Sequence, residues 1–146
     1  MAKLLKKSIQ KKAKKKKVSA KAVVLHDEKV LLLKQKDGRW DLPGGKADKK
    51  EGVAQALKRE VKEETGLKVK PEKHLTVTNR VRMRRKNLLV LSFLCSPQKK
   101  IGKKRIKLSH EHKDYKLVDI KKAKKLKMRK RHKKAITAAH RHLKKA

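Results

Sequence analysis

The sequence predicts an α/β domain in which helices pack on a mixed β-sheet, and three observations support this fold class. Several short apolar runs are rich in valine, isoleucine and leucine, the composition of strands. Residues 49–65 repeat apolar side chains with the period of a helix. Near the end of the chain, Ile136, Ala139, His140 and Leu143 fall on one helical face, which can lie on a sheet.

The chain is expected to begin its folded part with a hairpin. Residues 18–26 and 29–34 are apolar runs on either side of Asp27 and Glu28, which suits two strands joined by a tight turn. Pro43-Gly44-Gly45 should then interrupt regular structure, because proline and glycine disfavour strands and helices.

A helix is expected over residues 49–65. Asp48 and Glu51 have the spacing of a capping box, and Gly66 can end the helix in a left-handed conformation. Apolar side chains at i, i+4 and i+8 give this helix a face to bury, namely Val53, Leu57 and Val61.

After this helix the sequence predicts short strands separated by basic or Pro/Gly-containing turns, and then two helices. Asp119 is placed to cap a short helix through Leu126, and the final amphipathic helix follows it. The expected strands cover residues 67–69, 76–79, 88–95, 105–108 and 116–118.

Charge is unevenly distributed along the chain. Among 146 residues there are 49 Lys and Arg against 13 Asp and Glu, a formal net charge of +36. Residues 1–17 and 121–146 contain no acid at all. Because like charges repel, we expect residues 1–17 to form a flexible basic arm and residues 18–146 to form one domain with basic C-terminal helices. The arm either binds phosphates or another polyanion, or is solvated without a dedicated partner.

Composition also excludes several classes of protein. No stretch approaches the roughly 18–20 consecutive apolar residues of a membrane span, and the Lys-rich start lacks an apolar signal segment. Cys95 is the single cysteine, which excludes an intramolecular disulfide and suits a reducing compartment. Aromatic residues make up only 2% of the chain, so any affinity for nucleic acid should be electrostatic. We therefore expect an intracellular protein, cytoplasmic rather than nuclear, although a lysine run can also act as a nuclear localisation signal.

Three glutamates of the predicted helix lie on one face. Glu60, Glu63 and Glu64 are spaced i, i+3 and i+4, so their mutually repelling carboxylates converge. Oxygen ligands of this kind suit Mg²⁺ or Mn²⁺, which can also bridge to substrate phosphates, and the Pro43-Gly44-Gly45 loop allows a close backbone approach. On spacing alone, the alternative is an exposed helix whose glutamates pair with neighbouring lysines.

A longer pattern resembles the Nudix box. Gly45 is followed after five residues by Glu51, and after seven more by the segment Arg59-Glu60-Val61-Lys62-Glu63-Glu64-Thr65-Gly66-Leu67. Trp40-Asp41-Leu42-Pro43-Gly44 and the order of elements extend the likeness over most of residues 18–143. Nudix proteins are typically divalent-metal-dependent hydrolases of a nucleoside diphosphate linked to another moiety. The resemblance implies an α/β/α sandwich in which the box forms a loop, a helix and a second loop.

The resemblance also implies roles for individual residues. Glu51 would add an acidic or water-mediated contact to the metal, whereas Arg59 would orient the carboxylates, since its spacing to Glu63 permits an i,i+4 ion pair. The metal would neutralise the diphosphate and align the attacking water. The ligands of Mg²⁺, or of Mn²⁺ in its place, would be Glu60, Glu63, Glu64 and the carbonyl of Gly45.

The same resemblance leaves the general base open between two glutamates. Glu60 is favoured as both ligand and base, and Glu111, in a loop before the last helices, is the second candidate. Glu111 could equally be an exposed acid paired with lysines, and its neighbour His112 is expected at the surface. The basic side chains expected to contact substrate phosphates are Lys46, Arg80 and Arg82.

The Nudix resemblance implies a Mg²⁺-dependent pyrophosphohydrolase that cleaves the diphosphate linkage of a nucleoside di- or triphosphate derivative. Because a strongly positive surface attracts anionic ligands, a nucleoside triphosphate is the general expectation and the 5′ end of an RNA the more specific one. The alternative is a basic RNA-binding scaffold with a Nudix fold and little or no turnover, whose binding would survive loss of the glutamates. An intact box favours the enzyme.

Overall fold

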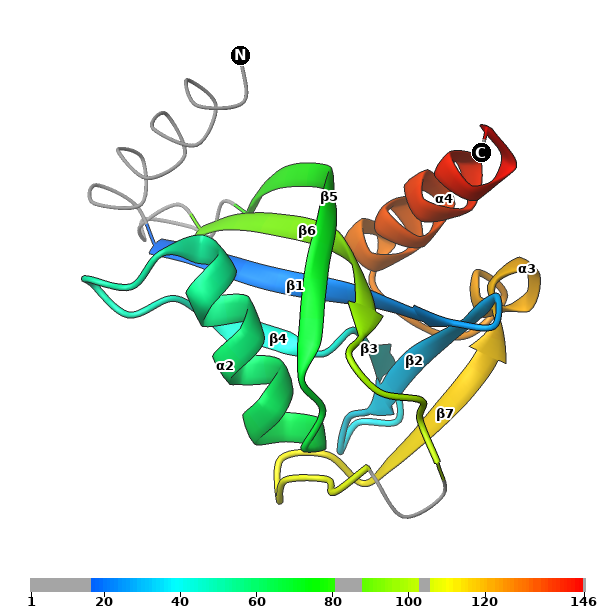
Figure 1. The fold of residues 1–146 in the computed structure, drawn as a ribbon, viewed down its shortest axis with the longest axis horizontal. Helices are drawn as coiled ribbons and strands as arrows, with labels where there is room; N and C mark the ends of the chain where they lie inside the picture. The colour runs from blue at the N-terminus through cyan, green and yellow to red at the C-terminus, as the bar shows by residue number, and fades with distance from the viewer. Residues whose placement is uncertain (1–16, 81–87, 103–105, 146) are drawn as a thin grey trace.

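The computed structural model describes residues 17–80, 88–102 and 106–145. Its strands form one mixed sheet with the order β3-β2-β1-β6-β5, in which β4 pairs with β1 and β7 with β2 (Figure 1). Strands β1 and β6 run parallel, and the other pairs are antiparallel. The strands are β1 (Lys17–His26), β2 (Lys29–Lys34), β3 (Trp40–Asp41), β4 (Gly44–Lys46), β5 (Val69–Arg80), β6 (Leu88–Pro97) and β7 (Asp114–Asp119).

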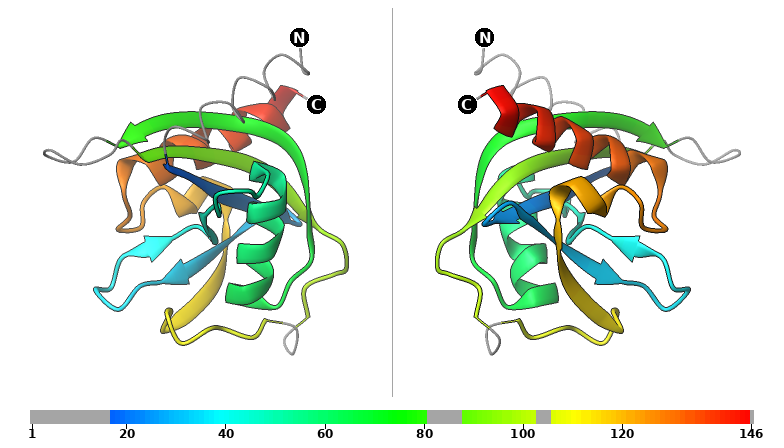
Figure 2. Two further views of the ribbon diagram at one scale, coloured as in Figure 1. Left: turned by 90° about the vertical axis from the view of Figure 1, so that its left-hand side faces the viewer. Right: turned by 90° about the vertical axis from the view of Figure 1, so that its right-hand side faces the viewer.

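Helices cover both faces of the sheet. Helix α2 (Val53–Thr65) lies on one face, and the short α3 (Ile120–Ala123) and the long α4 (Lys130–Lys145) lie on the other. Figure 2 views the molecule from these two sides, with α2 in front in the left panel and α4 in front in the right panel. The predicted α/β/α sandwich with a mixed sheet is confirmed.

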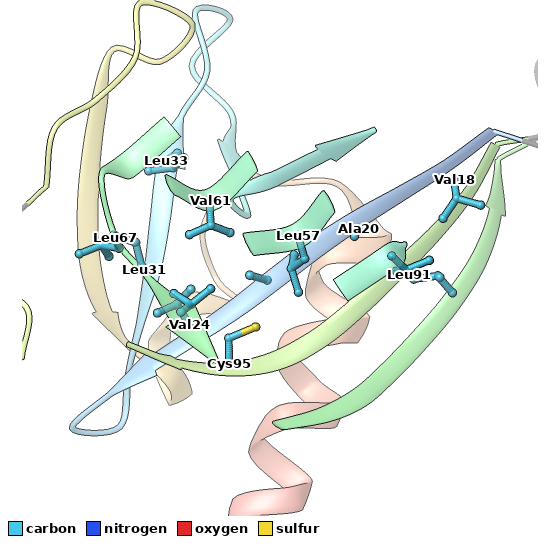
Figure 3. Packing of buried hydrophobic residues seen from close by; sticks show 13 residues of the cluster. Val18, Ala20, Val24, Leu31, Leu33, Leu57, Val61, Leu67, Leu91 and Cys95 are labelled. Atoms are coloured by element: carbon cyan, nitrogen blue, oxygen red, sulfur yellow. The ribbon is translucent and has the colours of Figure 1, made fainter. Parts of the chain in front are cut away.

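Alternation along β1 divides the interior into two cores, because successive strand residues point to opposite faces. Ala20 and Val24 face α2 and belong to a cluster that includes the fully buried Leu57 (Figure 3). Val23, between them, faces the other side and belongs to a cluster that includes Ile136 of α4. One strand therefore anchors both helical layers.

The first helix starts later than predicted. It begins at Val53, with Gly52 at the N-cap position donating its N–H to Gln55 Oε1 at 3.3 Å. Asp48 and Glu51 instead form a turn before the helix, in which the Asp48 N–H donates to Glu51 Oε1 at 3.1 Å. Gly66 ends the helix with φ 76°, as expected.

Strand pairing explains two further differences from the predicted elements, and a third is a predicted strand that does not form. Val69 and the segment 76–79 belong to one long strand, β5, which pairs with β6 across two irregularities in register, whereas residues 67 and 68 precede it. Gly44 and Gly45 do not interrupt the sheet, because they pair with β1 as part of β4. Residues 106–108 are irregular rather than a strand, and the Lys107 N–H donates to the carbonyl of Thr65.

The chain ends as expected in two helices. Asp119 Oδ1 accepts a hydrogen bond from the Lys121 N–H at 2.9 Å, which confirms it as the cap of α3. This helix ends at Ala123, earlier than the predicted Leu126. Of the predicted basic arm, residues 1–16 lie outside the described residues. No helix in the described part of the chain is long and apolar enough to cross a membrane.

Candidate active site

Arg59 organises the acidic face of α2. Its guanidinium donates to both carboxylate oxygens of Glu51, at 2.7 and 2.9 Å, and to Glu60 at 3.0 Å. It also reaches Glu63 at 3.2 Å, which is the expected i,i+4 pair, and the backbone carbonyl of Lys46 at 3.2 Å. The planar fork of an arginine suits such multiple contacts, so one cation fixes three carboxylates against the β4 backbone.

Glu64 lies in a different environment from the other glutamates. It is buried, with 5% of its surface exposed, and its Oε2 accepts a hydrogen bond from the Gly44 N–H at 3.3 Å. Burial raises the pKa of Glu64 to about 7, although the nearby Lys21 ammonium opposes this shift. The neighbouring groups thus do not fully offset the cost of burying the ionised carboxylate, and an added cation would stabilise it.

Two glycines allow this close packing around the glutamates. A Cβ on Gly45 would lie 2.7 Å from the carboxyl carbon of Glu60. Gly44 has φ +132°, and a Cβ there would lie 2.0 Å from the carbonyl oxygen of Ala20 in β1. Gly45 therefore lets the Glu60 carboxylate contact the backbone of β4, and Gly44 lets β4 pair closely with β1.

The donor set fits a hard divalent cation in its chemistry. Glu60, Glu63 and Glu64 offer only carboxylate oxygens, and Gly45 adds a backbone carbonyl nearby. Across residues 17–80, 88–102 and 106–145, no three His, Cys, Asp or Glu side chains are already arranged to hold a metal ion. Arg59 engages the carboxylates of Glu60 and Glu63.

A hollow of about 430 Å³ lies beside Glu64. Glu111 is exposed and lines it from the loop that precedes β7, so two chain segments far apart in sequence place carboxylates at one site. Lys21 and Lys36 also line this hollow and can attract phosphate groups. A smaller adjoining hollow of about 190 Å³ shares Lys21, Gln35 and Asp41 with it, and Arg129 and Arg131 contribute to its wall.

A buried polar cluster centred on Asp41 joins the two hollows. Lys21 Nζ lies 3.3 Å from Asp41 Oδ2 and also donates to the carbonyls of Leu42 and Gly44, at 3.1 and 3.3 Å. His132 Nε2, from α4, lies 2.9 Å from Asp41 Oδ1. Burial acts to raise the pKa of Asp41, but the neighbouring ammonium and imidazoles hold it well below its usual value. The cluster thus ties α4 and β1 to the segment that carries Gly44 and Gly45.

The remaining predicted residues lie in varied positions. Lys46 is exposed in β4, and its backbone carbonyl, rather than its side chain, contacts Arg59. Arg80 is the last residue of β5, and Arg82 lies outside the described residues. His112 departs from the expected surface position, because its side chain is 7% exposed and its Nε2 lies 3.9 Å from Asp41 Oδ2.

Sequence reasoning missed Lys21, Asp41 and His132. Lys21 interrupts an otherwise apolar strand, which is a signal that its ammonium needs a buried partner. Asp41 stands between Trp40 and Leu42 and gives a similar signal. The contact of Asp41 with His132 joins positions far apart in the chain, and no local pattern predicts such a pair.

Comparison with known proteins agrees with this geometry. The family model described as NUDIX domain matches residues 15–139 of the chain. The chain belongs to the NUDIX domain family. The predicted Nudix resemblance is therefore confirmed.

Two solved structures share the fold over most of their length. A MutT protein from Methanosarcina mazei Go1 superposes with a TM-score of 0.70 at 26% identity, covering 87% of this chain and 94% of its own. The E. coli ORF135 protein superposes with a TM-score of 0.71 at 22% identity, covering 85% of this chain and 88% of its own, which shows the common fold.

Two curated relatives match shorter segments. The human protein named 8-oxo-dGDP phosphatase NUDT18 is 42% identical over 64 residues, which cover 40% of this chain and 20% of the relative. A Bacillus subtilis (strain 168) protein, named as a candidate 8-oxo-dGTP diphosphatase, is 48% identical over 46 residues, covering 30% of this chain and 31% of the relative. The chain thus matches only about a fifth and a third of these relatives' lengths.

Proposed function

We propose that this NUDIX protein is a divalent-metal-dependent pyrophosphohydrolase acting on a nucleoside di- or triphosphate. The observation that carries the proposal is the meeting of Glu64 and Glu111 at one hollow, next to the Nudix helix and between lysines. Carboxylates suit metal and proton transfer, whereas the lysines suit a phosphate chain.

Each residue has a role in this proposal. Glu60, Glu63 and Glu64, with the Gly45 carbonyl, would hold Mg²⁺ or Mn²⁺, which when bound supplies charge neutralisation at the diphosphate. Arg59 fixes the directions of Glu60 and Glu63 by donating to both. Because Glu51 gives both its oxygens to Arg59, we assign it to positioning this arginine rather than to direct metal contact.

Proton transfer falls to a second carboxylate. Glu111 lines the hollow without belonging to the Arg59 network, so it is free to accept a proton from an attacking water. Glu60, the other candidate, belongs to the Arg59 network, since its Oε1 accepts a hydrogen bond from Arg59 at 3.0 Å. We therefore favour Glu111 as general base and keep Glu60 as ligand.

The names of the curated relatives suggest the first substrates to test. Both names refer to 8-oxo-deoxyguanosine phosphates, so 8-oxo-dGTP and 8-oxo-dGDP head the list. The 5′-triphosphate of an RNA remains the second choice, because the net charge of +36 favours polymeric anions over small ones. A basic scaffold without turnover is the alternative if binding is found without hydrolysis.

The decisive experiment compares Mg²⁺-dependent product release for 8-oxo-dGTP, 8-oxo-dGDP, dGTP, ADP-ribose and a 5′-triphosphorylated RNA. The test variant is Glu63→Gln/Glu64→Gln, and Glu72→Gln on β5 is the control, because its exposed carboxylate is remote from the hollow. We expect loss of turnover by more than about 100-fold in the test variant only. Equal turnover by both variants, or no turnover by the unmodified chain, would reject the hydrolase.

A further inference from the structure

The outer face of α4 is predominantly basic. A helix advances about 100° per residue, so five of its exposed cations project within one arc of roughly 100°. The opposite arc is buried against the sheet through Ile136, Ala139 and their neighbours. Figure 2 shows α4 on the outside of the molecule in its right panel. We call this arc the α4 basic face; it consists of Lys130, Lys134, Arg141, Lys144 and Lys145.

The charges of this face have no acidic partner within α3 or α4 themselves. Residues 120–146 contain no Asp or Glu. Within the described part of the chain, no lysine of α3 or α4 forms a salt bridge. Helix α2 differs, because its Arg59 engages glutamates. An unbalanced cluster of cations costs folding free energy by mutual repulsion, and bound anions would remove that cost.

His140 reports on the local potential beside this face. Desolvation lowers the pKa of its imidazole, and the ammonium groups of Lys144, Lys124 and Lys121 lower it further, whereas the Asp119 carboxylate opposes the shift. Lysines of α3, of α4 and of the turn between them therefore act on one point. The positive potential extends beyond α4 itself to the neighbouring short helix.

The α4 basic face also leads toward the candidate active site. Arg129 and Arg131, at the start of α4, line the smaller hollow of about 190 Å³. That hollow shares Lys21 and Asp41 with the larger one, which holds Glu64. Cations thus continue from the outer surface to the proposed reaction site.

We propose that the α4 basic face binds the phosphate backbone of a nucleic-acid strand. At about 1.5 Å per residue, the face is about 22 Å long, which matches roughly six nucleotides at about 3.4 Å each. A strand held there could present its end to the hollows, but its binding does not depend on hydrolysis.

The chemistry of the surface favours a phosphate backbone over other anionic partners. An amphipathic helix on a membrane inserts its apolar face into lipid, whereas the apolar face of α4 is buried against the sheet. Recognition of bases by stacking would need exposed aromatic rings. Trp40 is 9% exposed, and the ammonium groups of Lys34 and Lys116 lie 5.7 and 5.5 Å from its ring centre. The face should therefore read charge and not sequence.

The test measures binding of an unstructured, fluorescently labelled RNA by anisotropy over a series of salt concentrations. The variant is Lys130→Gln/Lys134→Gln/Lys144→Gln/Lys145→Gln in the full chain. The matched control removes four exposed lysines at the start of β5 and just after the end of β6, so net charge falls equally: Lys68→Gln/Lys70→Gln/Lys99→Gln/Lys100→Gln.

Four lost phosphate contacts should lower the slope of log K against log salt by about 2.8, from about 0.7 per contact on a single strand. Between about 50 and 200 mM salt, the affinity of the unmodified chain should then fall about 50-fold more than that of the α4 variant. The control should keep the original slope to within about 1. Equal loss in both variants, or an unchanged slope in the α4 variant, would overturn the proposal.

Two further measurements test whether the α4 basic face binds the phosphate backbone and whether the variant remains folded. Single-stranded DNA of the same length should bind with the same slope, and an absolute requirement for ribose would contradict backbone binding. The α4 variant should melt at the same or a higher temperature, because it relieves repulsion between cations. If it proves unstable, Lys134→Gln alone should lower the slope by about 0.7, and an unchanged slope in that variant would also reject the proposal.

Discussion

Adjacent glycines in β4 should respond to the same substitution in opposite ways. In Gly44→Ala, the new Cβ would lie 2.0 Å from the Ala20 carbonyl oxygen and 2.9 Å from Lys21 Cα, both backbone atoms of β1. Neither atom can move unless β4 separates from β1. In Gly45→Ala, the nearest atoms belong to the Glu60 carboxylate, at 2.7 Å, and a side chain can rotate away.

The magnitudes follow from these contacts. A positive φ of +132° at Gly44 costs an alanine about 1–3 kcal/mol, and disrupted pairing adds to this, so we expect a loss of more than about 3 kcal/mol. That corresponds to a fall in melting temperature of roughly 10 °C for a domain of this size. Gly45→Ala should cost about 1 kcal/mol or less in stability. Because it displaces Glu60, it should still lower turnover by about 100-fold.

Urea denaturation followed by circular dichroism, together with Mg²⁺-dependent turnover, separates the two effects. Gly44→Ala is expected to lose stability, and Gly45→Ala to lose activity while it remains folded. The reasoning fails if Gly45→Ala is as unstable as Gly44→Ala, or if it keeps full turnover.

Three further predictions concern Arg59, the Asp41 cluster and the α4 core. Arg59→Lys should lower kcat/KM at least about 10-fold and cost about 1 kcal/mol of stability, because an ammonium cannot hold Glu51 bidentately and still reach two more carboxylates. Steady-state kinetics and urea denaturation measure the two effects. Unchanged kinetics would refute the prediction. Burial lowers the pKa of His132, and the pKa of Asp41 lies well below its usual value. The stability that each group contributes is therefore present above the pKa that the group has in the unfolded chain. It should be lost as pH falls below about 6.5 for His132 and below about 4 for Asp41. Urea melts between pH 7 and 5 should show this loss in the unmodified chain and not in His132→Gln, and equal slopes would contradict it. Ile136→Ala should destabilise the chain by about 2–5 kcal/mol because its side chain is fully buried, and a loss below about 1 kcal/mol would show that α4 contributes little to the core.

Residues that act through local spacing were predicted well. Glu60, Glu63 and Glu64 share a helical face because a helix repeats every 3.6 residues, and this is a property of the sequence alone. The helix start was predicted less well, since Glu51 has two competing partners. Its carboxylate receives the Asp48 N–H but binds Arg59 bidentately, and only the folded chain decides which contact sets the boundary.

Contacts between distant segments required the tertiary structure. Lys21, Asp41 and His132 meet because Lys21 lies on the α4 side of the sheet and α4 packs on that face, and each of these facts depends on strand order. The expected surface position of His112 was wrong for the same reason. The burial of its side chain against Asp41 follows from the path of the loop before β7, which the sequence does not show. Glu111 could be named from the sequence, but its place beside Glu64 could not be derived from spacing.

The sequence by itself determined the family, the layered α/β fold, the acidic face of α2 and the excess of positive charge, because these depend on composition and on periods shorter than one helix. The tertiary structure decided which acid Arg59 binds bidentately, how Asp41 is compensated and where Glu111 lies. These depend on how the strands are ordered and how the helices pack on the sheet, and they join residues whose separation along the chain carries no periodic signal.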